Sequence, residues 1–409
     1  MRRLLATIAM GIALLTVSGS ASPAQDREAA QPPLIRGDQR VVIAMIDGLG
    51  PDYIKASEMP SLRRLMARGF SKTVLGVMPS VTNVNNASIA CGAWPEVHGI
   101  TGNSYYDEAR NALEYMEDSA YMLAPTVFRR AADRGIKTAL LTAKKKTLGL
   151  LSPGTELALA AESPTPEAIA RYGPAPPIYS REINAWLWEA AIDLLKNRPE
   201  IRLIYVHTTD YPMHTWPPSA PESREHLAKL DALIGRAVAT APDAAFLITA
   251  DHGLNAKSRC WDLTRACKNR GLELRFAFSA ERDKYVKHHR NLGGAAWVYL
   301  QSPDDAPRAT AILRGLKGVE EVLTRQEAAA RFHLMPGRIG ELIVLGDRET
   351  VFGDLPTEYE DLPPTLRTHG SLHETRVPMI IYNASGTIPP ADQLRYNFEM
   401  TRTLFRDPR

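Results

Sequence analysis

The sequence predicts an α/β fold with a doubly wound, mostly parallel central sheet flanked by helices. Three apolar runs, at residues 40–46, 202–207 and 245–249, have the continuous hydrophobicity of strands buried on both faces of a parallel sheet. Amphipathic patterns at 182–196 and 223–240 predict helices between these strands. A chain of 409 residues is long enough for one large domain of this kind that also carries an insertion.

The remaining elements follow from local periodicity and from glycine and proline punctuation. We expect helices at 59–68, 82–91 and 126–134, strands at 72–77 and 137–142, and a polar loop at 98–107. From residue 274 to 366 the pattern changes to short strands and helices, which indicates a smaller α+β insertion. The core is therefore expected to comprise 40–273 and 367–409, with a strand at 378–382 and a C-terminal helix from about 392 to 405.

The N-terminus has the layout of a secretory signal peptide, which we place at residues 1–24. Arg2 and Arg3 precede an apolar run at 4–17, and small residues then offer a cleavage site. The run is short for a membrane span, although an uncleaved membrane anchor is the alternative. Residues 25–39 form a polar tether. We expect export, most simply to a bacterial periplasm, and no membrane span in the mature chain.

Composition gives little sign of unusual partners. The chain is 44% hydrophobic and 23% charged, which is ordinary for a soluble globular protein. Its formal net charge of +3 includes Arg2 and Arg3 of the leader, so the mature chain is nearly neutral. This balance gives no reason to expect a nucleic acid polymer as a partner.

The three cysteines allow one disulfide. Cys260 and Cys267 are close enough in sequence to pair in an oxidising compartment, and the sequence leaves this pairing open. Cys91 lies on the inner face of the helix at 82–91 and is expected to be a buried apolar residue. No two cysteines have the C-x-x-C spacing, which argues against a cysteine-based structural zinc site.

Thr82 begins a predicted helix that follows a strand and a short turn. The backbone N–H groups of a helix N-terminus bind anions, so a hydroxyl there is well placed to attack a phosphorus or acyl centre. The alternative is that Thr82 is only the N-cap of this helix, with Asn85 and Asn86 in its first turn.

Carboxylates and imidazoles follow four of the predicted strands, where open α/β sheets bind their ligands. They are Asp47, Asp210 with His214, Asp251 with His252, and His369. Taken singly, each could be a helix cap or a solvated loop residue. Together with the Thr82 oxygen they could hold two divalent metal ions, and the mixture of carboxylate and imidazole favours Zn²⁺.

These segments resemble the alkaline phosphatase superfamily, specifically its nucleotide pyrophosphatase/phosphodiesterase branch and the related phosphonoacetate hydrolases. The matching motifs are Ile46-Asp47-Gly48, Pro79-x-Val81-Thr82-Asn83-x-Asn85-Asn86, His98-Gly-Ile-Thr-Gly-Asn103, Thr209-Asp210-x3-His214, Thr249-Ala250-Asp251-His252-Gly253 and His369-Gly370. The resemblance covers nearly all of the chain after the leader. It implies an alkaline phosphatase-like fold in which residues 274–366 form a cap.

The resemblance also implies two metal sites and a mechanism. One metal would be held by Asp47, Thr82, Asp251 and His252, and the other by Asp210, His214 and His369. Thr82 would be the nucleophile that becomes phosphorylated, and Asn103 would contact a phosphoryl oxygen of the transition state. His373 is expected to support the ligands from outside the first shell, whereas His98 and His207 are expected to be structural.

Two features favour phosphonoacetate as the substrate. The residues after Thr82 are rich in asparagine, where nucleotide phosphodiesterases usually have an aromatic residue and a proline. Residues 142–151 also look like the lysine loop that holds the substrate carboxylate, which makes Lys144 and Lys146 candidate substrate-binding residues. Their ammonium groups could neutralise the charge that grows on acetate as the C–P bond breaks. The alternative is that three consecutive lysines form a solvated loop.

Other functions stay open at this point. The predicted leader favours an exported nucleotide pyrophosphatase/phosphodiesterase that acts on nucleotides or other phosphodiesters, with Tyr105, Tyr106, Tyr211 and Trp216 available to stack a base. A sulfatase is disfavoured because its usual nucleophile motif is absent. A binding module that has lost catalysis is disfavoured because Thr82 and every ligand position are retained. The sequence does not fix the oligomeric state, and a homodimer is one option.

Overall fold

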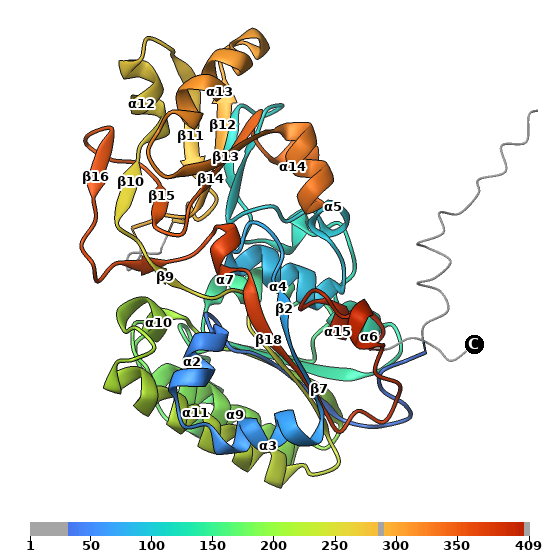
Figure 1. The fold of residues 1–409 in the computed structure, drawn as a ribbon. Coiled ribbons are helices and arrows are strands. Elements are labelled where there is room, and N and C mark those ends of the chain that lie inside the picture. The colour runs from blue at the N-terminus through green and yellow to red at the C-terminus, as the bar shows by residue number, and fades with distance from the viewer. Residues whose placement is uncertain (1–31, 285–289, 405–409) are drawn as a thin grey trace, which may run out of the picture.

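The computed structural model describes residues 32–284 and 290–404. Its central sheet has seven strands in the order β2-β18-β8-β1-β7-β5-β6 (Figure 1). They are β1 (Val41–Met45), β2 (Phe70–Leu75), β5 (Lys137–Thr142), β6 (Leu157–Ala160), β7 (Ile201–His207), β8 (Ala245–Thr249) and β18 (Arg376–Tyr382). Only β18 runs against the others, since it pairs antiparallel with both β8 and β2. The predicted mostly parallel sheet is confirmed.

The register of three central strands positions the candidate ligands. β1 lies between β7 and β8, and all five of its residues are buried. Met45 of β1 is in register with His207 of β7 and with Thr249 of β8. The three strands therefore end at the same edge of the sheet, so the residues that follow them meet there.

Helices cover both faces of the sheet (Figure 1). One face carries α3 (Pro60–Arg68), α9 (Glu182–Asn197) and α11 (Pro221–Thr240), and the other carries α4 (Thr82–Cys91), α6 (Val127–Ala132), α7 (Lys145–Leu151) and α15 (Glu399–Arg402). Shorter helices are α2 (Pro51–Ala56), α5 (Pro95–His98), α8 (Pro166–Tyr172) and α10 (Tyr211–Thr215). α9 illustrates the amphipathic design, because it buries an apolar stripe that includes Trp188.

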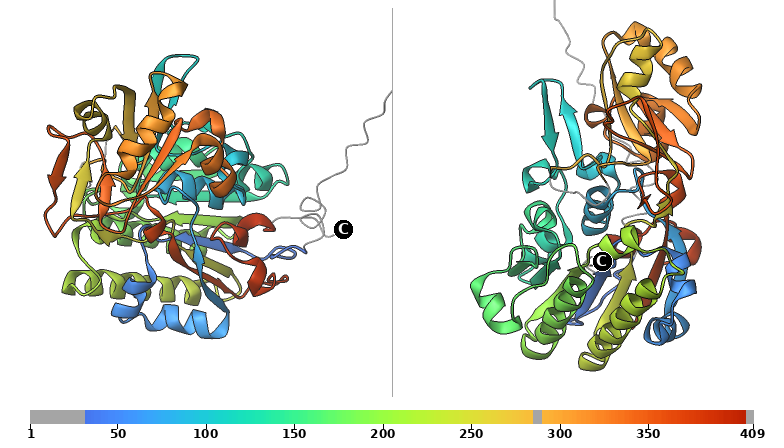
Figure 2. Two further views of the ribbon diagram at one scale, coloured as in Figure 1. Left: turned by 45° about the horizontal axis from the view of Figure 1, so that its top comes forward. Right: turned by 90° about the vertical axis from the view of Figure 1, so that its left-hand side faces the viewer.

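A smaller subdomain, the cap, lies beyond the carboxyl ends of the central strands (Figures 1 and 2). It holds a four-stranded antiparallel sheet in the order β11-β12-β14-β13 and a three-stranded sheet in the order β15-β10-β16. Its elements are β10 (Arg259–Trp261), α12 (Leu263–Asn269), β11 (Leu274–Ser279), β12 (Ala295–Leu300), α13 (Ala306–Arg314), β13 (Val319–Thr324), α14 (Arg325–Phe332), β14 (Leu342–Gly346), β15 (Thr350–Phe352) and β16 (Tyr359–Asp361). The cap strands thus begin at β10, before the residue 274 at which the insertion is expected to start.

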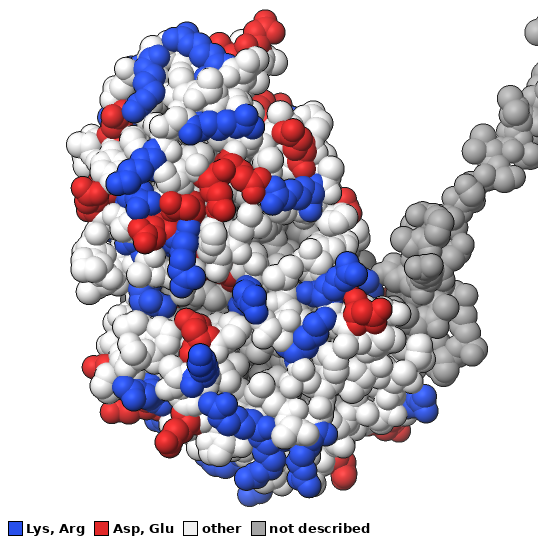
Figure 3. Space-filling view, in the orientation of Figure 1, with Lys and Arg blue, Asp and Glu red and all other residues white. Residues whose placement is uncertain are grey.

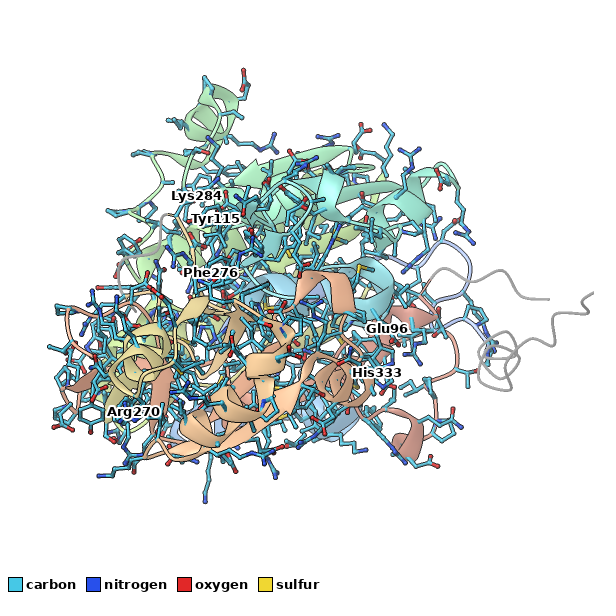
Figure 4. All side chains as sticks on the ribbon, turned by 90° about the horizontal axis from the view of Figure 1, so that it is seen from above. Glu96, Tyr115, Arg270, Phe276, Lys284 and His333 are labelled. Atoms are coloured by element: carbon cyan, nitrogen blue, oxygen red, sulfur yellow. The ribbon has the colours of Figure 1, made fainter. Side chains whose placement is uncertain are left out.

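One short ladder and several side-chain contacts connect the cap to the core. β9 (Asn255–Ala256) pairs with β17 (Arg367–Thr368) where the chain enters and leaves the cap. β3 (Ser104–Asp107) and β4 (Ala112–Tyr115) form a hairpin that packs against the cap, with the rings of Tyr106 and Phe276 4.7 Å apart. On α14, the C-cap residue His333 places its Nδ1 3.0 Å from Glu96 of α5 (Figure 4).

The structure corrects two local predictions. The segment 98–107 is not a loop throughout, because β3 occupies its last four residues and buries Tyr105 and Tyr106. The predicted C-terminal helix from 392 is wrong for most of its described length, since only Glu399–Arg402 is α-helical. Instead, the backbone around Tyr396 runs beside the end of β2, where Leu75 N donates to Arg395 O and Asn397 N donates to Leu75 O.

The cysteines are all free and buried. Cys260 and Cys267 lie in different apolar clusters of the cap, so the disulfide that the sequence left open is not formed. Cys91 is buried on α4 as expected, and burial raises the pKa of its thiol to about 12. These thiols are therefore poorly reactive.

Two expectations about partners concern the surface and the leader. The predicted signal peptide at residues 1–24 and residues 25–31 of the tether lie outside the described residues. Across the described ranges, no helix has both the length and the apolar character needed to cross a membrane. On the face shown in Figure 3, acidic and basic side chains both occur over the cap and the core.

We expect Gly48→Ala to destabilise the protein by about 3 kcal/mol. Gly48 follows Asp47 with a φ of +75°, and an added Cβ would lie 2.7 Å from Leu254 Cδ1 and 3.1 Å from Asp210 Cβ. The left-handed backbone costs roughly 1 kcal/mol and overpacking roughly 1–3 kcal/mol more. Urea unfolding measures the loss.

The matched control is Gly135→Ala. Gly135 has a φ of +67° but nothing within 4 Å of the added Cβ, so only the backbone cost of roughly 1 kcal/mol applies. Equal losses in the two variants would show that the turn after β1 tolerates a side chain.

Candidate metal centre

The six side chains that the sequence singles out as metal ligands lie together at the carboxyl edge of the sheet. Asp47 follows β1, Asp210 follows β7, and Asp251 and His252 follow β8. His214 lies on α10, one turn after Asp210, and His369 directly follows β17. All six are buried.

Their donor atoms form two groups that share one histidine. The atoms of Asp47, Asp251 and His252 lie within 4.8 Å of one another, and so do those of Asp210, His252 and His369. His214 adds its Nε2 to the second group, 2.7 Å from Asp210 Oδ2. The rings of His252 and His369 stack with their centroids 3.5 Å apart, which places the two groups side by side.

The histidine rings are oriented as metal ligands usually are. The Nδ1 of His214 lies 2.6 Å from the carbonyl oxygen of Arg367, that of His252 lies 3.1 Å from Gly253 O, and that of His369 lies 2.8 Å from Ser80 O. An Nδ1–H donated to a carbonyl leaves Nε2 as the free donor atom, which is the common arrangement at zinc sites. The Nε2 atoms accordingly face the aspartates, as His252 Nε2 does at 3.3 Å from Asp251 Oδ2.

The carboxylates also fit a divalent cation. Asp47 Oδ1 and Asp251 Oδ2 are buried oxygens to which no group in the described part of the chain donates a hydrogen bond. A buried oxygen without a donor is costly, and a cation would satisfy both. Three carboxylates with three imidazoles suit zinc or a similar borderline metal.

Thr82 is not the N-cap of α4. Val81 holds the cap position and makes no side-chain cap bond, so Thr82 is the first helical residue. Its hydroxyl oxygen instead lies 3.5 Å from His252 Nε2, beside the shared ligand. Asn85 holds the preceding turn by accepting from Val77 N and donating to Val77 O. The structure therefore directs the Thr82 hydroxyl at the centre.

Asn103 lies between the hairpin and the cap. Its Nδ2 donates to the main-chain oxygen of Glu281 at 3.3 Å and to the carboxylate Oε2 of Glu281 at 3.2 Å. Glu281 is buried just past β11, and its Oε1 lies 3.1 Å from His369 Nδ1. No motif pointed to Glu281, because it lies in the insertion, far in sequence from the residues it contacts.

Lys144 lies inside the centre. Its Nζ lies 2.6 Å from Asp47 Oδ2 and 3.0 Å from Asp210 Oδ1. Burial and the charge of Asp210 would raise the pKa of Asp47, but the Lys144 ammonium and a hydrogen bond from His207 outweigh them and hold this pKa well below its usual range. Burial would likewise lower the pKa of Lys144, but Asp210 and Asp47 raise it overall, so the ammonium stays charged.

The other lysines differ from one another. Lys146 is nearly buried and pairs with Asp283 of the cap at 2.5 Å. Lys145 is the exposed one, and α7 begins at this residue. A solvated loop of three lysines is therefore not what the structure contains.

Three further histidines complete the description. His207 Nε2 lies 3.2 Å from Asp47 Oδ2, so it supports a candidate ligand directly. His98 pairs with Ser88 at 2.8 Å, and burial lowers its pKa to about 3, as suits a structural residue. His373 is partly exposed and its Nε2 lies 2.7 Å from Glu320 on β13, which differs from the expected contact with the ligands.

The fold is that of the alkaline phosphatase superfamily. The family described as type I phosphodiesterase / nucleotide pyrophosphatase matches residues 41–372, and the chain belongs to this family.

Among solved structures, the phosphonoacetate hydrolase of Sinorhizobium meliloti 1021 in complex with phosphonoacetate is similar over 91% of this chain and 98% of that chain, with 30% identity and a TM-score of 0.81. Its complex with phosphonoformate gives a TM-score of 0.80. Murine ectonucleotide pyrophosphatase/phosphodiesterase 5 is 16% identical, with a TM-score of 0.64 over 89% of this chain and 93% of that chain, which shows a likeness of fold.

Two curated relatives are diesterases of greater length. A venom phosphodiesterase of Naja atra is 24% identical over 233 residues, which is 53% of this chain and 26% of that protein. Ectonucleotide pyrophosphatase/phosphodiesterase family member 3 of Mus musculus is 26% identical over 234 residues, 53% of this chain and 25% of that protein. The matched part thus spans about a quarter of the length of these relatives.

We expect Zn²⁺ to stabilise the protein through this centre. At a free concentration 100 times its Kd, one bound ion adds about 2.7 kcal/mol to the free energy of unfolding. Urea unfolding with and without zinc should show this gain in the wild type and lose most of it in Asp251→Asn. Asp133→Asn, at an exposed surface aspartate, should keep the full gain. A gain that survives Asp251→Asn would contradict the assignment of this ligand.

Glu281→Ala should weaken zinc binding by about 10–100-fold, the usual effect of removing a group that orients a ligand histidine. Glu281→Gln should lose less, because its amide oxygen still accepts a hydrogen bond. Competition with a chromophoric chelator measures the affinity. Glu320→Ala is the matched control, since it removes another cap glutamate that contacts a histidine, His373, which is not a candidate ligand. Equal affinities in Glu281→Ala and Glu320→Ala would contradict this role.

Proposed function

We propose that the protein is a dinuclear-metal phosphonate hydrolase that cleaves phosphonoacetate to acetate and phosphate with Thr82 as its nucleophile. The observation that carries this proposal is the position of Lys144, whose ammonium lies within the centre between Asp47 and Asp210. A substrate carboxylate bound beside the metals would meet this charge. The near-complete overlap with a phosphonoacetate hydrolase, at 30% identity, supports the same substrate.

The centre would hold two ions, which we propose to be Zn²⁺. One ion would be bound by Asp47, Thr82, Asp251 and His252, and the other by Asp210, His214 and His369. Both ions would stabilise negative charge on the phosphoryl oxygens. The hydroxyl oxygen of Thr82 attacks phosphorus and its proton passes to solvent. The C–P bond breaks, and its electron pair moves onto the methylene carbon and into the carboxylate as an enolate. A proton from solvent then gives acetate. Water attacks the phosphothreonine, which releases phosphate and restores Thr82.

The chain's own groups account for the charge that develops. Lys144 neutralises the substrate carboxylate, into which the electron pair of the broken bond is delocalised. Lys146 assists from the first turn of α7, where Asp283 orients its ammonium. Asn103 Nδ2 donates to both the main-chain oxygen and the carboxylate of Glu281, so it would exchange one of these two hydrogen bonds for one to a phosphoryl oxygen. These groups favour the transition state, in which the charge on the leaving carbon is largest.

The alternative function is a nucleotide pyrophosphatase/phosphodiesterase, which the family match and the curated relatives favour. Tyr211 and Trp216 beside the centre could stack a base, with ring centroids 6.2 Å apart. Tyr105 and Tyr106 are buried and serve packing instead. A module that has lost catalysis is disfavoured because all six ligands and Thr82 converge. The proposal also includes export to a periplasm, which the predicted signal peptide supports. A homodimer is the oligomeric state that the sequence leaves open.

Zinc-loaded protein should release phosphate from phosphonoacetate, and Thr82→Ala should abolish this release. Because the residual rate without a nucleophile can fall by several orders of magnitude, the phosphate assay needs stopped time points over hours. A nitrophenyl ester of thymidine monophosphate is assayed in parallel. Turnover of the ester alone would establish the diesterase alternative, whereas activity of Thr82→Ala on either substrate would refute the nucleophile. Lys144→Ala should impair phosphonoacetate far more than the ester.

A further inference from the structure

A cavity of about 300 Å³ opens beside the candidate metal centre. Lys144 and Lys146 line it from the start of α7, Thr209 lines it from the residue before Asp210, and Asp283 lines it from the cap. Because Lys144 Nζ also contacts Asp47 and Asp210, the cavity adjoins the centre directly. A molecule bound at the metals therefore has this space next to it.

The cavity has one apolar wall and is otherwise lined mostly by charged side chains, Glu117 and Glu162 among them. Ile178 and Tyr179 form the apolar wall, from the segment between α8 and α9. Tyr179 is 39% exposed, which is high for a large apolar side chain beside a cavity. Its ring centroid lies 5.7 Å from that of Tyr211, which packs in turn near Trp216. An exposed aromatic ring supported from behind is typical of a surface that receives an apolar ligand group.

The cap contributes Asp283 to the lining of the cavity, and the residue next to it packs on the hairpin. Lys284 stands over the ring of Tyr115, with Nζ 4.5 Å from the ring centroid (Figure 4). Its neighbour Asp283 pairs with Lys146, so this part of the cap is fixed to the hairpin and to α7. The cavity therefore lies between α7 of the core and this part of the cap.

Phosphonoacetate does not account for all of this space. It consists of a phosphonate, one methylene and a carboxylate, of which the metals and Lys144 would take the two charged ends. Neither end needs Ile178 or Tyr179. A volume of about 300 Å³ lies at the lower end of pockets that hold drug-sized ligands.

We infer that this cavity binds an apolar substituent on the methylene carbon of the substrate, so that the substrate class is α-substituted phosphonoacetates. The inference rests on the proposed function for the position of the phosphonate and the carboxylate. The reaction is unchanged: the C–P bond breaks, water supplies the oxygen that phosphate gains, and a proton completes the substituted acetate. Tyr179 is then a specificity residue that packs against the substituent.

Binding tests the inference without turnover. The probes are phosphonoacetate and its benzyl derivative 2-phosphono-3-phenylpropanoate, titrated calorimetrically into zinc-loaded Thr82→Ala protein, in which three ligands of the affected ion remain. Burial of a phenyl group should make the benzyl compound bind about 10–100-fold more tightly. Equal Kd values, or weaker binding of the benzyl compound, would overturn the inference.

Variants of Tyr179 assign the effect to the apolar wall. Added to the Thr82→Ala background, Tyr179→Ala should remove most of the benzyl preference and change the Kd of phosphonoacetate by less than about twofold. Tyr179→Phe keeps the ring and should keep the preference. Ile169→Ala, at an exposed isoleucine on α8, is the control and should change neither Kd. An equal weakening of both compounds by Tyr179→Ala would overturn the role of this residue.

Turnover separates the two proposals. Zinc-loaded wild type is given each compound, and phosphate release is followed. A lower KM for the benzyl compound supports both proposals. Release from neither compound would overturn the proposed function, and with it the assignment of these compounds as substrates, even where the benzyl compound still binds more tightly.

Discussion

Three buried carboxylates at one edge of a sheet are the constraint on which the rest of the structure depends. Asp47, Asp210 and Asp251 meet there because β1, β7 and β8 end in register. Like charges held together in a buried site repel each other and lose their hydration, so positive charge has to balance them. This positive charge comes from the Lys144 ammonium, from the imidazoles and from the candidate metal ions.

The constraint extends into the cap. Glu281 and Asp283 lie two residues apart, yet the first contacts His369 and Asn103 while the second pairs with Lys146. One short segment of the cap therefore touches the candidate metal ligand His369, the candidate phosphoryl contact Asn103 and the candidate carboxylate contact Lys146. The cap is part of the site, and a change in its position would be felt by all three.

The sequence was most informative where chemistry and regular structure coincide. The buried strands, and the acids and histidines that follow them, could be predicted because an apolar run that ends in Asp or His has few other interpretations in an α/β chain. Glu281 could not be found this way, since its role depends on where the cap folds back. The sequence predicts only a structural role for His207, because its place at the end of a strand does not reveal the neighbouring Asp47, which it supports.

Competition between local and tertiary preferences explains the other differences. The pattern at 392–405 is compatible with a helix, but the backbone around Tyr396 bonds to the end of β2 and is extended. Tertiary pairing of this kind overrides weak helix propensity. Thr82 is similarly a residue type that often caps helices. Only the position of His252 in the fold shows that the Thr82 hydroxyl faces the candidate metal centre instead.

The ladder of β9 and β17 has a consequence for how such proteins diversify. Both passages of the chain between core and cap run through these two strands, where Thr368 pairs with Asn255. His252 lies just before the first strand and His369 just after the second, so the ladder closes the centre at the root of the insertion. Apart from the segment of Glu281 and Asp283, which contacts the site, the chain between the two strands can therefore vary in size and shape while the geometry of the candidate ligands is kept. Selection on this part of the chain alone can then change what the same metal chemistry acts upon.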